Sequence, residues 1–475
     1  MIRAFELFGV KSMKGIFAKE KIEKYSWIIY YLIIVFVAVL FVGSVYPAEI
    51  PDDTTNILND LFHHDRWRDW HPVTYYIFIK SSMYLIRSTH MVVLAQTVLF
   101  LIAQFQIVRY IHLYCKKQVQ MIYLFTTLIV GFAGFEYLVI LQKDAPYTYG
   151  FLGVTITLMY CIKEKGRTFR LIELFIWCAI TSAMRHMGWL SIALGIVILA
   201  IVMIRNEKSK WSLRILIAAV IGIILTLSVR EYMVARYDIV KPPKYVTYTM
   251  PLYMLGAYTE SKYDLDEKIV EVLEEVMPVE KWNSCYNEDQ FFADHLSRDT
   301  VVNEGYIFNV DEKNLYGKVI YCNARFFVRH PIDYCYKLFR MNSLVWSIST
   351  PKGGYVGGMY PGFSGAYLNE QFPEWNAREA FSSGLVYPIV EFMIQTPMKN
   401  IVHRGGLVFW AMIVCIIVLC RKKKVATAMV LAPVMFLNIM MMLSIPQQDP
   451  RYVLPEIVVG CIVPVLLGEK EKKEN

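Results

Sequence analysis

Residues 27–46 read WIIYYLIIVFVAVLFVGSVY, a run of twenty residues without a charged side chain. A helix needs about 20 mostly apolar residues to cross the hydrocarbon core of a bilayer. The run is too long for the apolar core of a signal peptide, and no small-residue cleavage site follows it. The sequence therefore predicts a retained first membrane span here.

Nine further apolar runs follow the first one. They lie near 90–113, 121–141, 147–162, 169–184, 188–204, 212–228, 405–420, 425–445 and 453–468. The composition agrees, since 56% of the residues are hydrophobic and 19% are charged, against about 25% charged in soluble domains. The expected fold class is an all-α polytopic membrane protein with about 10 transmembrane helices.

The distribution of Lys and Arg predicts the orientation of these spans. With the N-terminus inside, the inner segments are 1–26, 114–120, 163–170, 205–214, 421–424 and 469–475, and they hold 23 Lys and Arg residues. The short outer segments 47–70, 142–146, 185–187 and 446–452 hold five. This bias predicts a multi-pass protein of the cell (plasma) membrane with both termini cytoplasmic. The net charge of +8 then reflects orientation, so no nucleic acid partner is expected.

The chain divides into four predicted parts. They are a cytoplasmic basic amphipathic segment (1–26), a transmembrane module with the first outer loop (27–228), an extracytoplasmic domain or lid (229–400), and C-terminal transmembrane helices with a basic tail (401–475). The third part is a mixed insert between spans 7 and 8, because it is rich in charge and holds no convincing span.

Some local features of the insert are also predicted. Pro331 is expected to open an amphipathic helix over 331–347, and the Gly- and Tyr-rich residues 353–365 are expected to form a loop. Cys285, Cys322 and Cys335 allow one disulfide, but the sequence does not fix its partners.

Familiar sequence motifs are absent. There is no phosphate-binding loop, dinucleotide fingerprint, His-Glu-x-x-His or Cys-x-x-Cys, which disfavours ATP-driven pumps, dinucleotide enzymes and common zinc proteases. The span centres are nearly free of charge, which disfavours an ion-coupled transporter. Glu136 is the clearest exception, and we place it near the outer interface.

Charged residues gather instead in four outer segments. Taken singly, each is explained by an interfacial anchor or a loop cap; together, an acid or a base in every outer turn predicts the walls of one pocket. The residues are Asp52, Asp53 and His71 in the first loop, Lys143 and Asp144 in the second, Arg185 in the third, and Arg451 and Tyr452 in the fourth. Residues 72–86 predict a helix that lies along the membrane surface.

An acidic pair just after the first span, followed about 20 residues later by His-Pro and a surface aromatic helix, resembles the integral-membrane GT-C glycosyltransferases. The protein O-mannosyltransferases and the lipid A aminoarabinose transferase are the most similar in style. The resemblance covers the span layout through about residue 228 and the last spans, and it is weak over 229–400. It implies transfer of a sugar from a polyprenyl-phosphate donor to a lipid, glycan or protein acceptor hydroxyl, on the outer face of the membrane.

The resemblance also implies roles for the outer residues. The catalytic base falls on Asp52 or Asp53, with Asp52 favoured, and Asp144 matches the acid after span three. The donor phosphate contacts fall on His71, Lys143, Arg185, Arg451 and Tyr452. A carboxylate suits proton removal from a hydroxyl, and Arg or protonated His suits the charge that grows on the departing phosphate.

Other interpretations stay open at this point. Asp52, Asp53, Asp144 and His71 offer ligands of the kind that Mg²⁺ or Mn²⁺ binds. This chain has Asp-Asp and His-Pro-Val where the family often has Asp-Glu and a second proline, so the base and the need for a metal are undecided. A lipid-linked glycan polymerase or ligase, or a transporter or flippase, would share the topology.

Overall fold

The computed structural model describes residues 19–62, 66–207, 211–286, 296, 304–349, 376–444 and 449–470. Most of the expected basic segment 1–26 and the whole expected loop 353–365 lie outside these ranges. The described part is almost entirely helical, and its two short strands, β1 (Val45–Tyr46) and β2 (Arg378–Glu379), pair antiparallel.

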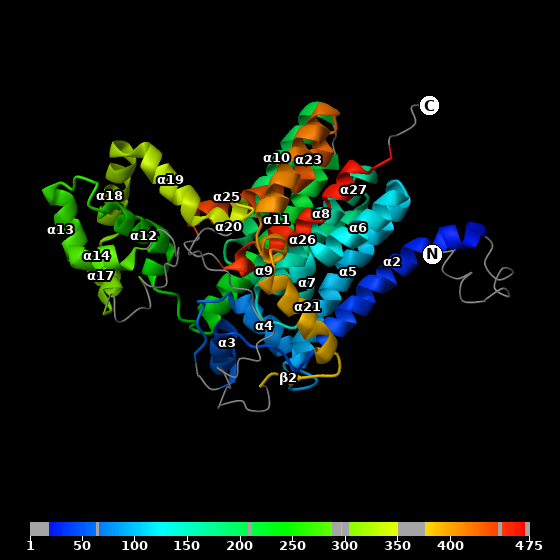
Figure 1. The fold of residues 1–475 in the computed structure, drawn as a ribbon, viewed down its shortest axis with the longest axis horizontal. Helices are drawn as coiled ribbons and strands as arrows, with labels where there is room; N and C mark the ends of the chain where they lie inside the picture. The colour runs from blue at the N-terminus through cyan, green and yellow to red at the C-terminus, as the bar shows by residue number, and fades with distance from the viewer. Residues whose placement is uncertain are drawn as a thin grey trace.

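Every predicted span coincides with a helix or a broken helix of the main bundle (Figure 1). These elements are α2 (Lys19–Val42), α5 (His90–Tyr114), α6 (Gln118–Ile129) with α7 (Phe132–Glu136), α8 (Asp144–Lys163), α9 (Thr168–Met184), α10 (Gly188–Glu207), α11 (Trp211–Arg236), α23 (Gly406–Arg421), α24 (Val425–Ala428) with η6 (Met429–Leu431) and α25 (Ala432–Ser444), and α26 (Leu454–Gly460) with α27 (Val463–Leu467).

Five helices in the described part are long and apolar enough to cross a membrane. They are Tyr25–Val42, His90–Tyr114, Gly188–Arg205, Trp211–Arg236 and Val425–Ser444. Three more apolar helices, Gln118–Ile129, Gly406–Arg421 and Leu454–Leu467, are shorter. The fold is that of a helical membrane protein, with fewer full-length spans by this measure than the ten that the sequence predicts.

The predicted span 121–141 is broken. The helix is interrupted after Ile129 and ends at Glu136, residues 137–139 form a turn, and Ile140 then pairs with Glu49 in an isolated parallel bridge. The buried Gln96 amide donates to the carbonyls of Tyr137, Leu138 and Ile140 at 3.1, 2.6 and 3.1 Å. These bonds satisfy backbone acceptors that the end of the helix leaves free, so the chain can turn back into the bundle without an energetic penalty.

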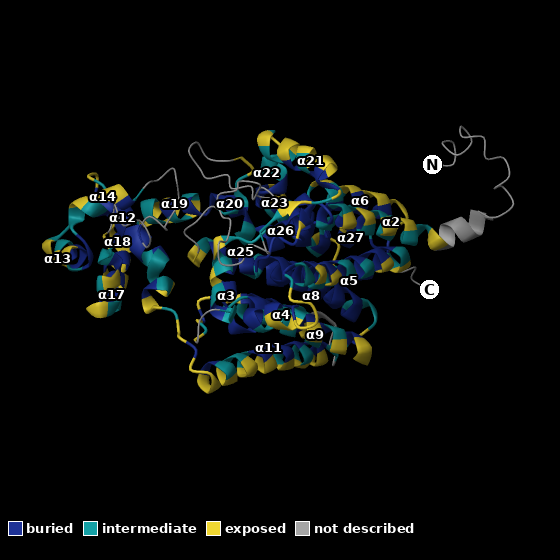
Figure 2. Cartoon of the chain, turned by 90° about the horizontal axis from the view of Figure 1, so that it is seen from below, coloured by how far each residue is buried: buried dark blue, intermediate teal, exposed yellow. Residues whose placement is uncertain are grey.

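Helix α8 is the centre of the bundle and is buried along almost all of its length (Figure 2). It packs against α5, α9 and α26. Glycines make the closest approaches: a Cβ at Gly153 would lie 2.2 Å from the Trp177 ring of α9. Between α10 and α25, a Cβ at Gly195 would lie 2.3 Å from the backbone nitrogen of Pro433.

The loops that connect the bundle helices lie at two opposite ends of the bundle. At one end Lys163 pairs with Glu469 at 2.6 Å, and Arg170 pairs with Glu164 and Glu173 at 3.0 and 2.7 Å. The predicted outer residues gather at the other end. Successive helices run in opposite directions, so the predicted inner and outer residues lie at opposite ends of the bundle, as the predicted order of the spans requires.

The surface helix expected over 72–86 is present as α4 (Val73–Ser82), and α3 (Asp52–Phe62) precedes it. One side of α4 is buried, including Tyr75, Tyr76 and Ile79. Both helices lie at the end of the bundle where the predicted outer residues gather (Figure 1).

The insert expected over 229–400 divides into two parts. A helical lobe with a hydrophobic core of its own extends from Tyr245 to Met341 (Figures 1 and 2). The later residues Leu344, Val345, Val386 and Val402 belong to the core of the bundle.

The lobe consists of η2 (Lys244–Tyr248), α12 (Thr249–Tyr258), α13 (Glu267–Val276), α14 (Val279–Cys285), η3 (Tyr306–Phe308), α17 (Asn309–Glu312), α18 (Tyr316–Arg329) and α19 (Pro331–Met341). The segments that follow are α20 (Ser343–Trp346), α21 (Ser383–Gln395) and α22 (Lys399–Val402).

The described insert is therefore helical rather than mixed, apart from the two-residue strand β2. The reason is local, since α13 and α18 each bury one apolar side at helical spacing in the core of the lobe. The helix expected at Pro331 is confirmed as α19, with the proline in its first turn. No disulfide joins the lobe cysteines: Cys285 and Cys322 are buried thiols, and Cys335 is exposed.

Replacing Gly195 by Ala should destabilise the protein, because the new methyl group meets backbone atoms of Pro433 that cannot move aside. Overpacking of this kind costs about 1–3 kcal/mol. Gly317→Ala in α18 is the matched control, since a Cβ there meets no atom within 4 Å. Thermal unfolding of the purified variants in detergent should show a lower melting temperature for Gly195→Ala alone. Equal melting temperatures for the two variants would contradict the tight approach of α10 to α25.

Candidate active site

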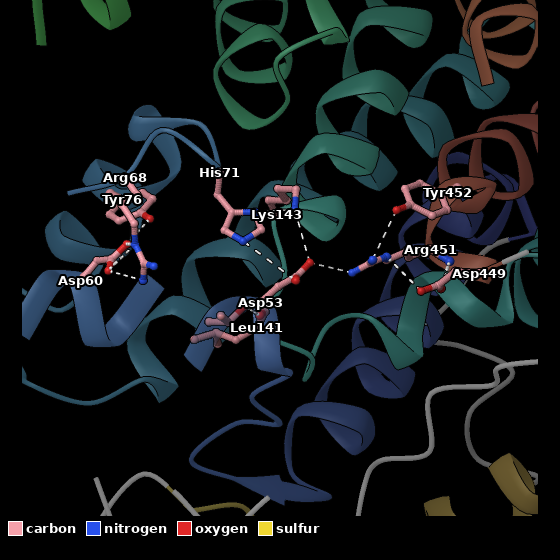
Figure 3. Close-up of polar contacts among 11 residues, drawn as sticks. Asp53, Asp60, Arg68, His71, Tyr76, Leu141, Lys143, Asp449, Arg451 and Tyr452 are labelled. Atoms are coloured by element: carbon pink, nitrogen blue, oxygen red, sulfur yellow. Dashed lines mark hydrogen bonds and ion pairs between the residues drawn. The ribbon is translucent and has the colours of Figure 1, made fainter. Parts of the chain in front are cut away.

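Asp53, in the first turn of α3, lies among three basic side chains that come from three different loops (Figure 3). Its Oδ2 is 2.8 Å from Nη1 of Arg451 and 3.6 Å from Nζ of Lys143. Its Oδ1 is 4.0 Å from Nε2 of His71. The Asp53 side chain is 17% exposed, so these contacts take place at the edge of the protein interior.

The first basic residue, Lys143, is positioned by the non-helical segment 137–143 between α7 and α8. Backbone hydrogen bonds of 2.9 and 2.8 Å tie Glu49 to Val139 and Leu141. The Thr54 hydroxyl donates to the Leu141 carbonyl, which links α3 to the same segment. The break in the predicted third span is therefore what brings Lys143 next to Asp53.

The second basic residue, Arg451, lies in the short helix η7 (Pro450–Tyr452). The Asp449 carboxylate accepts from the Arg451 backbone N–H at 3.0 Å and also pairs with its Nε at 3.0 Å. Arg451 Nη2 donates to the Tyr452 hydroxyl at 3.3 Å. Three contacts within one turn thus aim the guanidinium group at Asp53.

The third residue, His71, is held by the buried Asp69 two positions earlier. Asp69 pairs with Arg230 of α11 at 2.5 Å and accepts from the Val73 backbone N–H, at the start of α4, at 3.3 Å. Nζ of Lys143 is 2.8 Å from Nδ1 of His71. A lysine has only donors, so Nδ1 accepts and the ring carries its proton on Nε2, facing Asp53.

The electrostatics of this group are set by burial and by the close charges. Burial opposes ionisation of Asp53, but Lys143, Arg451 and His71 together hold its pKa below its usual range. Burial and the neighbouring Lys143 lower the pKa of His71 to about 3. Burial also lowers the pKa of Lys143, although Asp53 acts in the opposite direction. Burial thus favours the neutral form of His71, and its contact with a donor phosphate stays a prediction.

A second ion pair lies beside the first. Nε of Arg185, at the end of α9, is 2.8 Å from Oδ1 of the buried Asp144. The Tyr452 ring lies between the two arginines, with its centroid 5.1 Å from the guanidinium carbon of Arg185 and 5.0 Å from that of Arg451. The two guanidinium carbons are therefore no more than about 10 Å apart, a distance that one phosphate group with its substituents can bridge.

A cavity of about 500 Å³ opens next to Asp53. Its lining contains Arg68, Trp70, His71 and Tyr76 and, on the far side, the segment Val240–Pro243. Arg68 is fixed by Asp60, whose carboxylate accepts from its Nη2 at 2.7 Å and from the Tyr76 hydroxyl at 2.9 Å (Figure 3). The cavity thus has Asp53 at one end and a second cationic group at the other.

Sequence reasoning missed Asp60, Arg68 and Lys241, which also lines the cavity. A signal was present, because Asp53, Asn56 and Asp60 follow the i, i+3, i+7 spacing of one helix face. All three line the cavity. A polar stripe at helical spacing after the first span was the pattern to find.

The other expected site residues are brought together by the fold. His71, Lys143, Asp144, Arg185, Arg451 and Tyr452 all belong to the network around Asp53. Asp52, the favoured base, is exposed at the first position of α3 and is absent from the cavity lining. The geometry favours Asp53 over Asp52.

Glu136 is buried inside the bundle rather than lying at the outer interface. Its Oε2 is 2.6 Å from Nε2 of His403, just before α23. The pairing of two distant segments explains how the charge is tolerated there.

The carboxylates do not fit the divalent cation considered above. Asp53 and Asp144 already face Lys143, Arg451 and Arg185. In the described ranges no three His, Cys, Asp or Glu side chains are grouped so that they could hold a metal ion. We therefore assign no step to a metal.

Comparisons of this chain with models of known protein families, with curated proteins and with solved structures find no match.

Asp53 should contribute to stability in a pH-dependent way. Its pKa is held below the usual value of about 3.9, so its contribution is complete above that value and is lost as the pH falls through the lowered pKa. Asp53→Asn should therefore cost about 3–5 kcal/mol at pH 7, and the difference from the unchanged protein should narrow below about pH 4. Melting temperatures across this pH range measure the effect.

Asp52→Asn is the matched control, because Asp52 is exposed and no basic side chain is recorded against it in the described part. Its melting temperature should follow that of the unchanged protein at every pH. A pH-independent loss in Asp53→Asn would show that the aspartate acts through packing rather than through its charge.

Proposed function

We propose that this protein is an integral-membrane glycosyltransferase that moves a sugar from a polyprenyl-phosphate donor to an acceptor hydroxyl at the outer face of the membrane. The observation that carries the proposal is Asp53 with Lys143 and Arg451 within 4 Å of it, next to a cavity. Glycosyl transfer needs a carboxylate beside a phosphate-binding cation cluster, because a proton leaves the nucleophile while charge grows on the leaving phosphate.

The donor phosphate belongs between Lys143, Arg451 and Arg185 in this proposal. All three are at least four-fifths buried as side chains and are held by carboxylates in the absence of a ligand. A bound phosphate competes with Asp53 and Asp144 for these cations. The Gln142 amide is buried beside them and has no hydrogen-bond partner in the described part of the chain, which is where a further polar ligand group is expected.

This competition explains how a carboxylate with a lowered pKa can act as a base. Without donor, Lys143 and Arg451 stabilise the ionised Asp53 and make it a weak proton acceptor. When the donor phosphate takes over these cations, the pKa of Asp53 returns toward its usual range. Asp53 then accepts the acceptor hydroxyl proton more readily, and the cations neutralise the departing phosphate.

The position of the site suits a lipid-linked donor. The first residues of α8, α10 and α26 are Asp144, Gly188 and Leu454, so the site lies where three bundle helices begin. A polyprenyl chain can follow the apolar helices while its phosphate stays at their ends. The proposal includes about ten spans in a GT-C-like arrangement, with both termini cytoplasmic in the plasma membrane.

A site at the helix ends also favours transfer over ion-coupled transport, which uses charges near the middle of the bilayer. A lipid-linked glycan polymerase or ligase would use the same chemistry with a longer donor. The acceptor in the proposal is a lipid, glycan or protein hydroxyl of the cell envelope.

Asp53→Asn should lower transfer by about 10²–10⁴-fold, since the amide keeps the shape of the carboxylate but accepts no proton. Asp52→Asn should remain close to full activity. The measurement is release of polyprenyl phosphate from a panel of polyprenyl-phosphate hexoses and pentoses by the reconstituted protein, with cell-envelope extract as acceptor. Equal activity of the two variants on the sugar that the unchanged protein uses would remove Asp53 from the mechanism.

Binding of the phosphate can be tested without knowing the sugar. Farnesyl phosphate should raise the melting temperature of the purified protein, and farnesol should not. Arg185→Lys and Arg451→Lys should each weaken this effect, because lysine keeps the charge but loses the planar two-pronged donor. Arg66→Lys is the control, since Arg66 pairs with Asp238 on the surface. An equal shift with all three variants would show that neither buried arginine contacts the phosphate.

A further inference from the structure

Helices α18 and α19 of the lobe expose a continuous series of large apolar side chains. On α19 the exposed positions are Ile332, Cys335, Tyr336 and Phe339, which follow the i, i+3, i+4, i+7 spacing of one helix face. Ile332 is 82% exposed, and Val328, near the end of α18, is 74% exposed. Ile320, Tyr321 and Phe327 extend the same kind of surface along α18.

Several charged residues of the same two helices pair with acidic side chains of the lobe, although Lys318 and Arg329 of α18 remain exposed. Lys337 is 1% exposed and pairs with Glu260 at 2.5 Å. Arg325 and Arg329 both pair with Asp266, just before α13, at 2.6 and 2.9 Å. A helix facing water normally presents its charges outward and its apolar face to the core. Here the outward face is apolar, and the charges are neutralised within the lobe.

The position of this face relative to the bundle is fixed at the end of α19. The Asn342 side chain donates to the carbonyl of Met442, in the last turn of α25, at 2.7 Å. The Trp346 indole donates to the Phe339 carbonyl, and the Trp410 indole of α23 donates to the Trp346 carbonyl, both at 2.9 Å. Figure 1 shows α19 leading from the lobe to α20 beside α25.

These contacts lie at the site end of the membrane helices. Met442 is near the C-terminal end of α25, and Trp410 is in the second turn of α23. Tryptophan is enriched where the hydrocarbon core meets the headgroups. On the bundle side, Leu443 of α25 and Val414 of α23 are both more than half exposed, as side chains that face lipid are.

We propose that the apolar face of α18 and α19 lies in the outer half of the bilayer and anchors the lobe to the membrane surface. The lipid-facing surface of α23 and α25 continues into this face through Trp410 and Trp346. Ile332, Tyr336 and Phe339 enter the boundary between headgroups and acyl chains, about 5–10 Å deep as in other interfacial helices. The basic residues Lys318, Arg325, Arg329 and Lys337 stay paired with carboxylates of the lobe.

Anchoring of the lobe would also affect the position of one wall of the cavity. The segment Val240–Pro243, which connects α11 to the lobe, lines the cavity beside Asp53. With α11 crossing the membrane at one end of the lobe and α19 lying on its surface at the other, the lobe has two attachments. Its height above the membrane, and with it this wall of the cavity, is then set by the bilayer.

Cys335 allows a direct test, because it is the one exposed cysteine among those in the described ranges and lies within the apolar face. The full chain, with the partly buried Cys420 replaced by Ser, is labelled at Cys335 with bimane and reconstituted in phosphatidylcholine vesicles. The control carries Cys335→Ser and Glu271→Cys, which moves the label to an exposed position on α13. Quenching by lipid carrying a doxyl group near the headgroup is compared with quenching by iodide from the outside.

The label at Cys335 should lose roughly half or more of its emission to the doxyl lipid and little to iodide, as a probe at interfacial depth does. The label at position 271 should show the reverse. Iodide quenching at Cys335 as strong as at position 271 would overturn the proposal, since the face would then meet water. Protection from both quenchers would overturn it as well, because another protein surface, such as a second copy of the chain, would cover the face.

Discussion

The ionised Asp53 carboxylate is the constraint on which the site end of the bundle depends. Lys143, Arg451 and Arg185 are buried at the ends of different helices, and without Asp53 and Asp144 they would repel one another at low dielectric. Each carboxylate occupies a place that an anionic ligand group would take. Asp53 and Asp144 thus neutralise these cations, and under the proposed function a donor phosphate would exchange with the carboxylates rather than fill an uncompensated positive cluster.

This arrangement requires interruptions in the membrane helices. A continuous helix over residues 121–141 would place Lys143 out of reach of α3, because the chain would leave the bundle in a straight line. The non-helical segment 137–143 loses helical backbone hydrogen bonds, and Gln96 and Glu49 supply partners from neighbouring elements. The polar residue Gln96 is therefore needed in the buried face of α5, and its role is visible only when α5 and the break are seen together.

The sequence predicts the parts of this structure that depend on the length of the apolar runs and on whether the number of spans between two loops is even or odd. Each apolar run is a helix or a broken helix, and counting spans is enough to bring Lys143, Arg185 and Arg451 to one end of the bundle. It could not decide between Asp52 and Asp53, which are adjacent in the first turn of α3. Their directions differ by about 100° around the helix, and the choice depends on the bond from Thr54 to Leu141, between segments 87 residues apart.

The wall of the cavity opposite α3 is tied to the loop that positions His71. The backbone N–H of Asp69 donates to Val240 at 2.8 Å, and the N–H of Val240 donates to Trp67 at 3.0 Å. Pro242 and Pro243 follow at once, and each fixes its own φ angle. The wall is therefore stiff and is attached to the bundle by backbone bonds, while its continuation leads into the lobe. A substrate must fit between this wall and the stripe Asp53, Asn56 and Asp60, so the distance between α3 and the 67–69 loop limits what the cavity admits. The pairing of Arg68 with Asp60 of α3 joins the two elements, so this ion pair helps to hold the two sides of the cavity at their distance.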